Sequence, residues 1–102
     1  MELLPEELKS RLPPIHAQEA EEDPRVFARY WIPGTNLAWY VLEGEPDGDD
    51  YMLFGFVTES SDFRYFRLSE LEAARSLLGQ TLELDTAFSA GRLTDVVPAP
   101  DL

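Results

Sequence analysis

Four β-rich runs follow one another in the middle of the chain, and their order limits the folds that the chain can adopt. The runs are "RVFARYWI", "LAWYVLE", "YMLFGFVTE" and "FRYFRL", and short polar connections separate them. Aromatic and β-branched residues favour strands, and short connections join strands that are antiparallel neighbours. We therefore predict an antiparallel meander over residues 25–67. The two inner runs are apolar on both faces, which indicates that each face of the sheet is at least partly covered.

A helix is predicted before the sheet, within residues 1–12. Pro5 suits the first helical turn, and two glutamates follow it there, where they complement the positive end of the helix dipole. Leu4, Leu8 and Leu12 recur at every fourth residue and form one apolar stripe. Two prolines come directly after this stripe and end the helix.

A second helix is predicted after the sheet, over residues 69–78. Ser69 and Glu72 have the spacing of a capping box at its start, and Gly79 fits a cap at its end. The following segment "QTLELDTAF" can add an edge strand to the sheet. Residues 95–102 are rich in proline, and we expect them to form a flexible tail.

These elements together predict one α+β domain over residues 1–102. Its core is a four- to five-stranded antiparallel meander, with the N-terminal helix and the later capping helix packed on it. A chain of 102 residues, 44% of them hydrophobic, has the size and the apolar content for one modest core.

The charge of the chain is strongly acidic, with 20 acidic and eight basic residues and a formal net charge of −12. A field of this sign repels phosphate backbones and anionic membrane surfaces, so we expect no direct nucleic-acid binding and no membrane binding. It favours encounter with a basic protein partner. The alternative is that an acidic surface only keeps the protein in solution.

Two short segments, "EAEED" and "EGEPDGDD", hold nearly half of the acidic residues. The second lies between two strand-like runs and is interpreted as a solvated hairpin loop, because its acids do not have the spacing of a calcium-binding loop. Both segments are candidate binding patches for a basic partner. Their carboxylates belong to Glu19, Glu21, Glu22, Asp23, Glu43, Glu45, Asp47, Asp49 and Asp50.

Aromatic side chains are concentrated in the β-rich region, and most of them are expected in the core. Sheets that bind RNA also carry aromatic residues, but these act beside basic residues, and this chain is acidic. Trp31, Tyr40 and Tyr65 are candidate interface anchors, provided that their side chains are partly exposed.

Residues for catalysis or metal binding are scarce. The chain has no cysteine and one histidine, His16, so an ordinary zinc site cannot be assembled. A catalytic imidazole needs a positioned partner, and no phosphate loop, nucleophile elbow or dinucleotide fingerprint occurs. We therefore predict no catalytic residues, no metal and no cofactor. The alternative is a small ligand-binding or catalytic domain that uses the aromatic sheet and a buried acid, with His16 folded back beside it.

The location of the protein is expected to be cytoplasmic. The first residues, "MELLPEELKSRL", lack the basic start and the continuous apolar run of a signal peptide. No apolar stretch approaches the roughly 20 residues that a membrane-spanning helix needs.

Four blocks, "LLPEELKSRLPP", "NLAWYVLEGE", "YMLFGFV" and "FRYFRLSELE", resemble a family of small bacterial proteins known only as a domain of unknown function. The resemblance covers roughly Leu3 to Thr94. It implies an accessory protein of plasmids, prophages and other mobile elements, and the family has no established activity or catalytic residues to transfer. Our hypothesis is a non-enzymatic acidic protein-binding module. In its sharper form the module imitates a nucleic acid and inhibits a host defence or DNA-processing complex.

Overall fold

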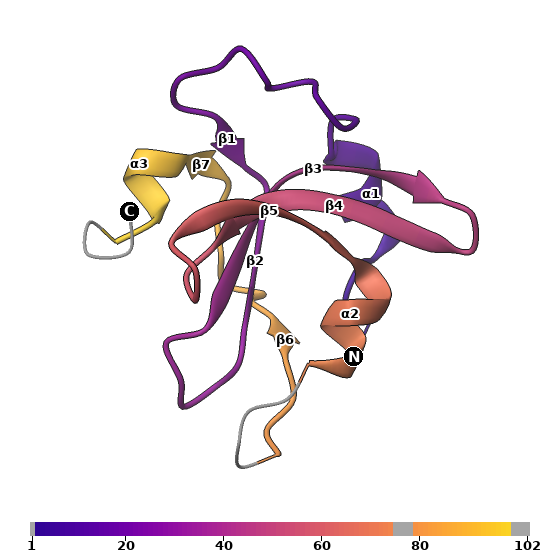
Figure 1. Ribbon diagram of the computed structural model, residues 1–102, viewed down its shortest axis with the longest axis vertical. Helices are drawn as coiled ribbons and strands as arrows, with labels where there is room; N and C mark the ends of the chain where they lie inside the picture. The colour runs from indigo at the N-terminus through magenta and orange to yellow at the C-terminus, as the bar shows by residue number, and fades with distance from the viewer. Residues whose placement is uncertain (1, 75–78, 99–102) are drawn as a thin grey trace.

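The computed structural model describes residues 2–74 and 79–98 of the chain. A five-stranded antiparallel sheet forms its centre, with the strand order β5-β4-β3-β2-β6, and a two-stranded ribbon of β1 and β7 lies beside it (Figure 1). In chain order the elements are α1 (Glu6–Arg11), β1 (Arg25–Val26), β2 (Ala28–Trp31), β3 (Ala38–Asp47), β4 (Asp50–Val57), β5 (Asp62–Arg67), α2 (Leu68–Ala73), β6 (Glu83–Leu84), β7 (Gly91–Arg92) and α3 (Leu93–Val96).

Strands β2 to β5 form the predicted meander, in which each strand pairs with the next along the chain. The α+β class and the antiparallel sheet with one helix before it and one after it are confirmed. Strand β6 pairs with the outer side of β2, so the segment predicted as an edge strand is one. The first run is the exception, because it divides into β1 and β2, and β1 pairs with β7 outside the main sheet.

A β-bulge in β3 sets the direction of the side chains that follow it. The register between β3 and β4 shifts between Val41 and Glu43, so that Val41 lies opposite Gly55 and Glu43 lies opposite Phe54. An extra residue in one strand interrupts the alternation of its side chains. Leu42 and Glu43 are neighbours in sequence, and both therefore lie on the sheet face that carries Phe54.

Different elements cover the two faces of the sheet. On one face, the stripe of Leu4, Leu8 and Leu12 packs with Leu71 of α2 against the sheet, and all four side chains are buried. On the other face, a second cluster joins the sheet to β1, to α3 and to the residue that follows α3. Figure 1 shows α3 and β7 on one side of the sheet and α2 on the other. The second cluster consists of Val26, Ala38, Tyr40, Leu42, Phe56, Leu93 and Val97.

The N-terminal helix is confirmed, although it covers only six residues within the predicted range. It begins after Pro5 and ends at Arg11, and Leu12 is already extended, as expected for a residue before a proline. None of the helices in residues 2–74 and 79–98 is long and apolar enough to cross a membrane.

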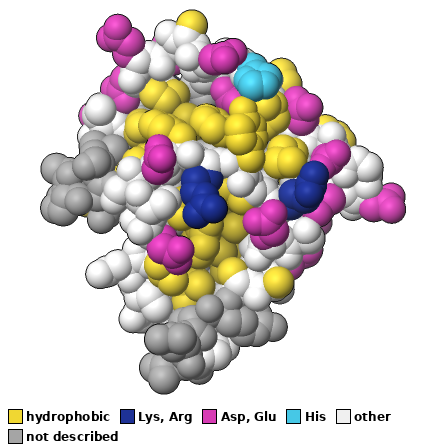
Figure 2. All heavy atoms as spheres, in the orientation of Figure 1, with side chains coloured by type: hydrophobic (Ala, Val, Ile, Leu, Met, Phe, Trp, Pro, Cys, Tyr) yellow, Lys and Arg dark blue, Asp and Glu magenta, His cyan; other side chains and the backbone are white. Residues whose placement is uncertain are grey.

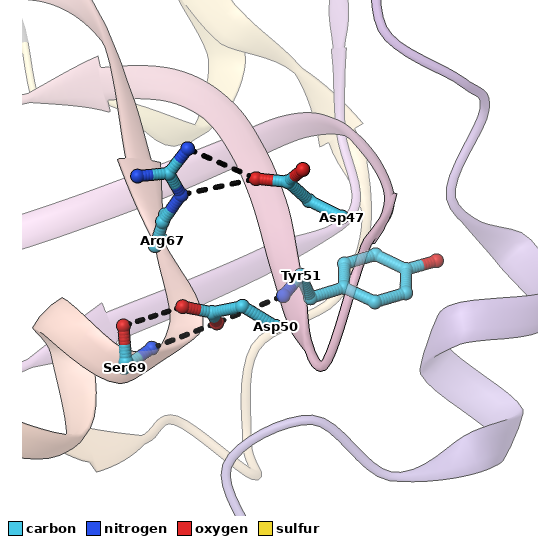
Figure 3. Close-up of polar contacts among 5 residues, drawn as sticks. All are labelled: Asp47, Asp50, Tyr51, Arg67 and Ser69. Carbon is cyan, nitrogen blue, oxygen red and sulfur yellow. Dashed lines mark hydrogen bonds and ion pairs between the residues drawn. The ribbon is translucent and has the colours of Figure 1, made fainter.

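The later helix is shorter than predicted and has no capping box. It ends at Ala73, Arg67 holds the N-cap position, and the side chain of Arg67 makes no capping hydrogen bond. Instead, the backbone amide and the hydroxyl of Ser69 both donate to the carboxylate of Asp50 in β4 (Figure 3). The bonds of Ser69 to Asp50, 19 residues earlier, thus replace the predicted local contact with Glu72. Residues 75–78, which complete the predicted helix, lie outside the described residues.

The expectation of a flexible tail is wrong for its first residues. Asp95 and Val96 belong to α3, and Val97 is buried with an exposed fraction of 3%. The hydroxyl and the amide of Thr94 both donate to Asp23, which fixes the start of α3 to the chain before β1. Residues 99–102 lie outside the described residues.

Candidate functional site

A groove of about 290 Å³ opens on the sheet face that carries Phe54, between the end of the sheet at β5 and the segment that joins α1 to β1. Its floor is apolar, and its opposite wall is polar and acidic. The groove is lined by His16, Gln18, Glu19, Glu21, Glu22, Pro24, Leu42, Glu43, Phe54, Phe63 and Tyr65.

The floor of the groove is a cluster of aromatic rings from β4 and β5. Phe54 lies opposite Tyr65 in the β4–β5 register, with ring centroids 4.8 Å apart, and it stacks on Phe63 at 5.9 Å. Phe63 also contacts the edge of Phe56 at 5.5 Å. Phe63 and Tyr65 remain 41% and 52% exposed, so the face offers open aromatic area. Figure 2 shows hydrophobic side chains gathered next to the histidine, with acidic side chains around them.

The wall of the groove is held in place by Glu43, which is buried with only 3% of its surface exposed. Its two carboxylate oxygens accept hydrogen bonds from the backbone amides of His16, at 2.8 Å, and Gln18, at 2.7 Å. A buried carboxylate is stable when such donors replace its lost hydration. Glu43 therefore attaches an otherwise irregular segment to the sheet.

Gln18 provides a second attachment of this segment. Its side-chain amide donates to the carbonyl oxygens of Arg25 and Leu42, and its side-chain oxygen accepts from the amide of Arg25. The carboxylate of Glu45 also accepts the amide of Ile15, at 3.0 Å. Because of these bonds the residues that face the groove are positioned without a helix or a strand of their own.

His16 lies at the end of the groove, and its side chain is 63% exposed. Its backbone has a φ angle of 77°, which is uncommon for a residue other than glycine. The imidazole contacts Tyr65 edge-on, with 6.4 Å between centroids, and its Nδ1 is 3.7 Å from a carboxylate oxygen of Glu19. His16 is thus folded back beside the buried Glu43, but it is the amide of His16 that the carboxylate binds.

The segment "EGEPDGDD" forms the expected hairpin connection, and residues 45–49 are exposed, but most of the segment is strand and not loop. Strand β3 continues to Asp47 and β4 begins at Asp50, so only two residues form the turn between them. Asp47 makes an ion pair with Arg67 of β5 at 3.0 Å (Figure 3). Glu43 and Glu45 bind backbone amides, and Asp49 is exposed in the turn.

Two of the predicted carboxylates are bound to hydroxyl groups. Hydrogen bonds from the hydroxyl and then the amide of Thr94 lower the pKa of Asp23 below its usual value. The hydroxyl of Ser69 is the largest cause that lowers the pKa of Asp50, followed by the amide of Tyr51 (Figure 3). Both side chains thus act as anchors that connect distant parts of the chain.

The nine predicted acidic residues therefore divide into two groups. Five of them bind a partner within the chain, as described above for Asp23, Glu43, Glu45, Asp47 and Asp50. The other four are exposed and hold no distant segment, although Glu19 lies 3.7 Å from Nδ1 of His16; three of the four line the groove. The exposed four are Glu19, Glu21, Glu22 and Asp49.

The three predicted aromatic anchors have different positions. Tyr65 is exposed and lies in the groove, as its proposed role requires. Tyr40 is only 3% exposed and accepts a hydrogen bond from Arg29, so the expectation that it is a surface anchor is wrong. Trp31 is half-buried under the guanidinium of Arg29, whose central carbon is 5.2 Å from the ring. Arg29 in turn makes an ion pair with Asp85 at 3.0 Å.

Phe54 and Phe63 are site residues that the sequence analysis did not single out. A signal for them exists, because Phe63 and Tyr65 are two residues apart in one strand and so project to the same face. Within the described residues, no cluster of three or more His, Cys, Asp or Glu side chains could hold a metal ion.

Comparison with known proteins identifies a family. No curated protein and no solved structure matches this chain significantly. A family model, described as "Protein of unknown function (DUF2958)", matches residues 3–97 and so covers nearly all of the chain. The chain belongs to this family of proteins of unknown function, DUF2958.

Proposed function

We propose that this protein is a non-enzymatic binding module that holds a basic part of a protein partner in the groove. The observation that carries the proposal is the meeting of exposed rings, Phe63 and Tyr65, with the exposed carboxylates of Glu19, Glu21 and Glu22 around one concave surface.

The physical chemistry of these two groups favours a cation. A lysine or arginine head over an aromatic face is attracted by the ring quadrupole, and arginine also stacks on the ring. Carboxylates at the rim pair with the same head, while the apolar stem of the side chain packs on the floor. The net charge of −12 increases the rate at which a basic partner arrives.

The wider context of the proposal is an accessory protein of mobile genetic elements, supported by the resemblance of the sequence blocks. Its sharpest form is imitation of a nucleic acid, which would inhibit a host defence or DNA-processing complex. The exposed carboxylates of Glu19, Glu21 and Glu22 support this form, since they lie close together along one segment. The five anchoring carboxylates do not, because each of them already binds a group of the same chain.

The experiment is affinity capture from a bacterial lysate at low and high salt, with two matched double variants. Glu21→Gln with Glu22→Gln removes two charges at the groove. Glu2→Gln with Asp49→Asn removes two exposed charges elsewhere, so it has the same net charge. We expect the parent and the second variant to retain a basic protein at low salt, and the first variant to lose it.

A further variant, Tyr65→Ala, tests the aromatic floor. We expect it to weaken capture of the same protein by at least about tenfold, as for a central aromatic anchor. Equal capture by both double variants and by Tyr65→Ala would contradict the proposal, because binding would then depend on overall charge alone.

A second candidate function is binding of a small molecule in the same groove. The observation that favours it is that a concave apolar surface contains the buried Glu43 beside His16. Both oxygens of Glu43 already accept backbone amides, so we propose ligand binding here in preference to acid–base catalysis. Native mass spectrometry of the purified protein tests this function: a retained compound that Tyr65→Ala loses would support it, and bare protein throughout would count against it.

A further inference from the structure

Strand β5 has an open edge next to the groove. The sheet order places β5 at one end, and in the part of the chain that the structure describes it pairs with β4 alone. The strand is six residues long, and its register with β4 has no bulge. The opposite edge strand, β6, has only two residues.

Natural sheets usually protect such an edge by proline, bulges or very short strands, because its free backbone groups can pair with another chain. β5 contains no proline, and one of its charged side chains, Arg67, is already paired with Asp47. β5 thus lacks proline, a bulge and the short length that protects β6, although it carries the charged residues Asp62, Arg64 and Arg67.

The direction of the backbone amides on the outer side of β5 follows from Phe63. Its backbone amide donates to the side chain of the preceding Asp62 at 2.8 Å, and not to β4. In an antiparallel strand, residues two apart direct their backbone groups to the same side. The amide of Tyr65 therefore also points to the outer edge, and that of Arg64 points to β4.

We propose that the partner supplies an extended basic segment that pairs with β5 as a further strand, with lysine or arginine at every second position. This inference rests on the proposed function. It adds that the basic part of the partner binds as an extended strand paired with β5. Alternate side chains of the added strand would lie on the groove face beside Phe63 and Tyr65. Their charged groups would lie beside the carboxylates of Glu19, Glu21 and Glu22 at the acidic wall of the groove.

The charges favour such a segment over a second copy of this chain. Pairing of β5 with β5 would bring together two molecules that each carry a net charge of −12. Like charges at an interface oppose association, whereas a basic segment is attracted by the same field.

The test uses isotope-labelled protein and a synthetic peptide of alternating arginine and threonine, about eight residues long, which is the length of an ordinary strand. Hydrogen exchange of single amides is followed by NMR. We expect the peptide to slow exchange at Phe63 and Tyr65 by roughly tenfold or more, and to leave Arg64 unchanged, because its amide already pairs with β4.

Two control peptides separate strand pairing from attraction of charge. A peptide with the same side chains but methylated backbone amides should give no slowing at Phe63 and Tyr65. An alternating glutamate and threonine peptide should not bind. The variant Tyr65→Thr, which retains a residue suited to strands, should weaken binding of the arginine peptide several-fold.

The outcomes distinguish this inference from the proposed function. Binding of the arginine peptide in the groove without slowed exchange at Phe63 and Tyr65 would overturn the added strand and leave the proposed function standing. No binding of the peptide would also overturn the inference, while capture by the groove variants would still decide the proposed function. Slowed exchange that depends on protein concentration, without peptide, would identify a second copy as the occupant and overturn the inference as well.

Discussion

Replacement of Glu43 by glutamine is the most direct test of how the groove is built. The parent carboxylate is buried and accepts two backbone amides, those of His16 and Gln18, one on each oxygen. Glutamine has nearly the same size, but its side-chain amide offers one acceptor oxygen and one NH2 group, which is a donor. The change therefore places the NH2 group of glutamine against a backbone amide that also donates. The volume that the buried side chain fills stays almost the same.

The magnitude follows from the two hydrogen bonds. A hydrogen bond to a charged group contributes about 1.5–3 kcal/mol to stability, and a buried donor left without an acceptor costs about 1–3 kcal/mol. Glu43→Gln loses one of the two bonds and converts the other to a neutral one. We therefore expect the free energy of unfolding to fall by about 2–3 kcal/mol, a large share of the 5–15 kcal/mol typical of a small domain.

The assay is urea unfolding followed by circular dichroism, with Glu45→Gln as the matched control. Glu45 accepts the amide of Ile15 but is exposed, so water can replace the lost bond and we expect a loss below about 1 kcal/mol. Faster hydrogen exchange at His16 and Gln18 in Glu43→Gln should accompany the loss of stability. Equal losses in the two variants would refute the anchoring role of Glu43.

Three further changes test the fold. Gly55→Ala should lower the free energy of unfolding by about 2 kcal/mol or more, measured in urea, because its Cβ would overlap the backbone oxygen of Tyr40. Hydrogen bonds hold the pKa of Asp50 low in the folded state, so their stabilisation is present above the unfolded pKa of about 3.9 and is lost as the pH falls through the folded value. Ser69→Ala should therefore make stability less dependent on pH in this acidic range, and an unchanged profile would contradict the cause assigned. Leu93→Ala should lower the free energy of unfolding by about 2–4 kcal/mol, measured in urea, since its side chain is 6% exposed in the second cluster; an unchanged value would contradict the packing of α3 on the sheet.

The meander could be predicted from the sequence because its information is local. Each strand carries its own run of aromatic and β-branched residues, and the connections are too short for any other pairing. The leucine stripe of α1 is equally local, and Leu4, Leu8 and Leu12 are all buried as predicted. Local patterns thus account for the order and the class of the main elements.

The errors occur where contacts between distant residues replace local ones. Ser69 has the spacing of a capping residue, but its hydroxyl binds Asp50 in the neighbouring strand. The C-terminal segment has the composition of coil, yet Asp23 binds Thr94 across 71 residues of sequence and thereby fixes the start of α3. Such bonds depend on the completed sheet, and no pattern within a short window predicts them.

In the candidate site, too, features that depend on distant contacts could not be predicted from local patterns. Tyr65 is one of three candidate anchors in the sequence, but no local pattern separates it from Tyr40, which is buried. The role of Glu43 could not be selected, since it depends on the bulge that turns this side chain to the face of Phe54 and on amides 25 and 27 residues away. Without the bulge, the carboxylate would point to the other face of the sheet.

The division of the acidic residues also decides how the charge should be studied. Removal of several carboxylates at once would mix two effects, because anchors such as Glu43 and Asp50 stabilise the fold while Glu21 and Glu22 lie free at the groove. A variant that loses Glu43 also displaces the wall of the groove, so its failure to bind would say nothing about charge. Only the exposed rim residues can separate recognition from folding, and it is on these residues that binding of a basic partner should depend.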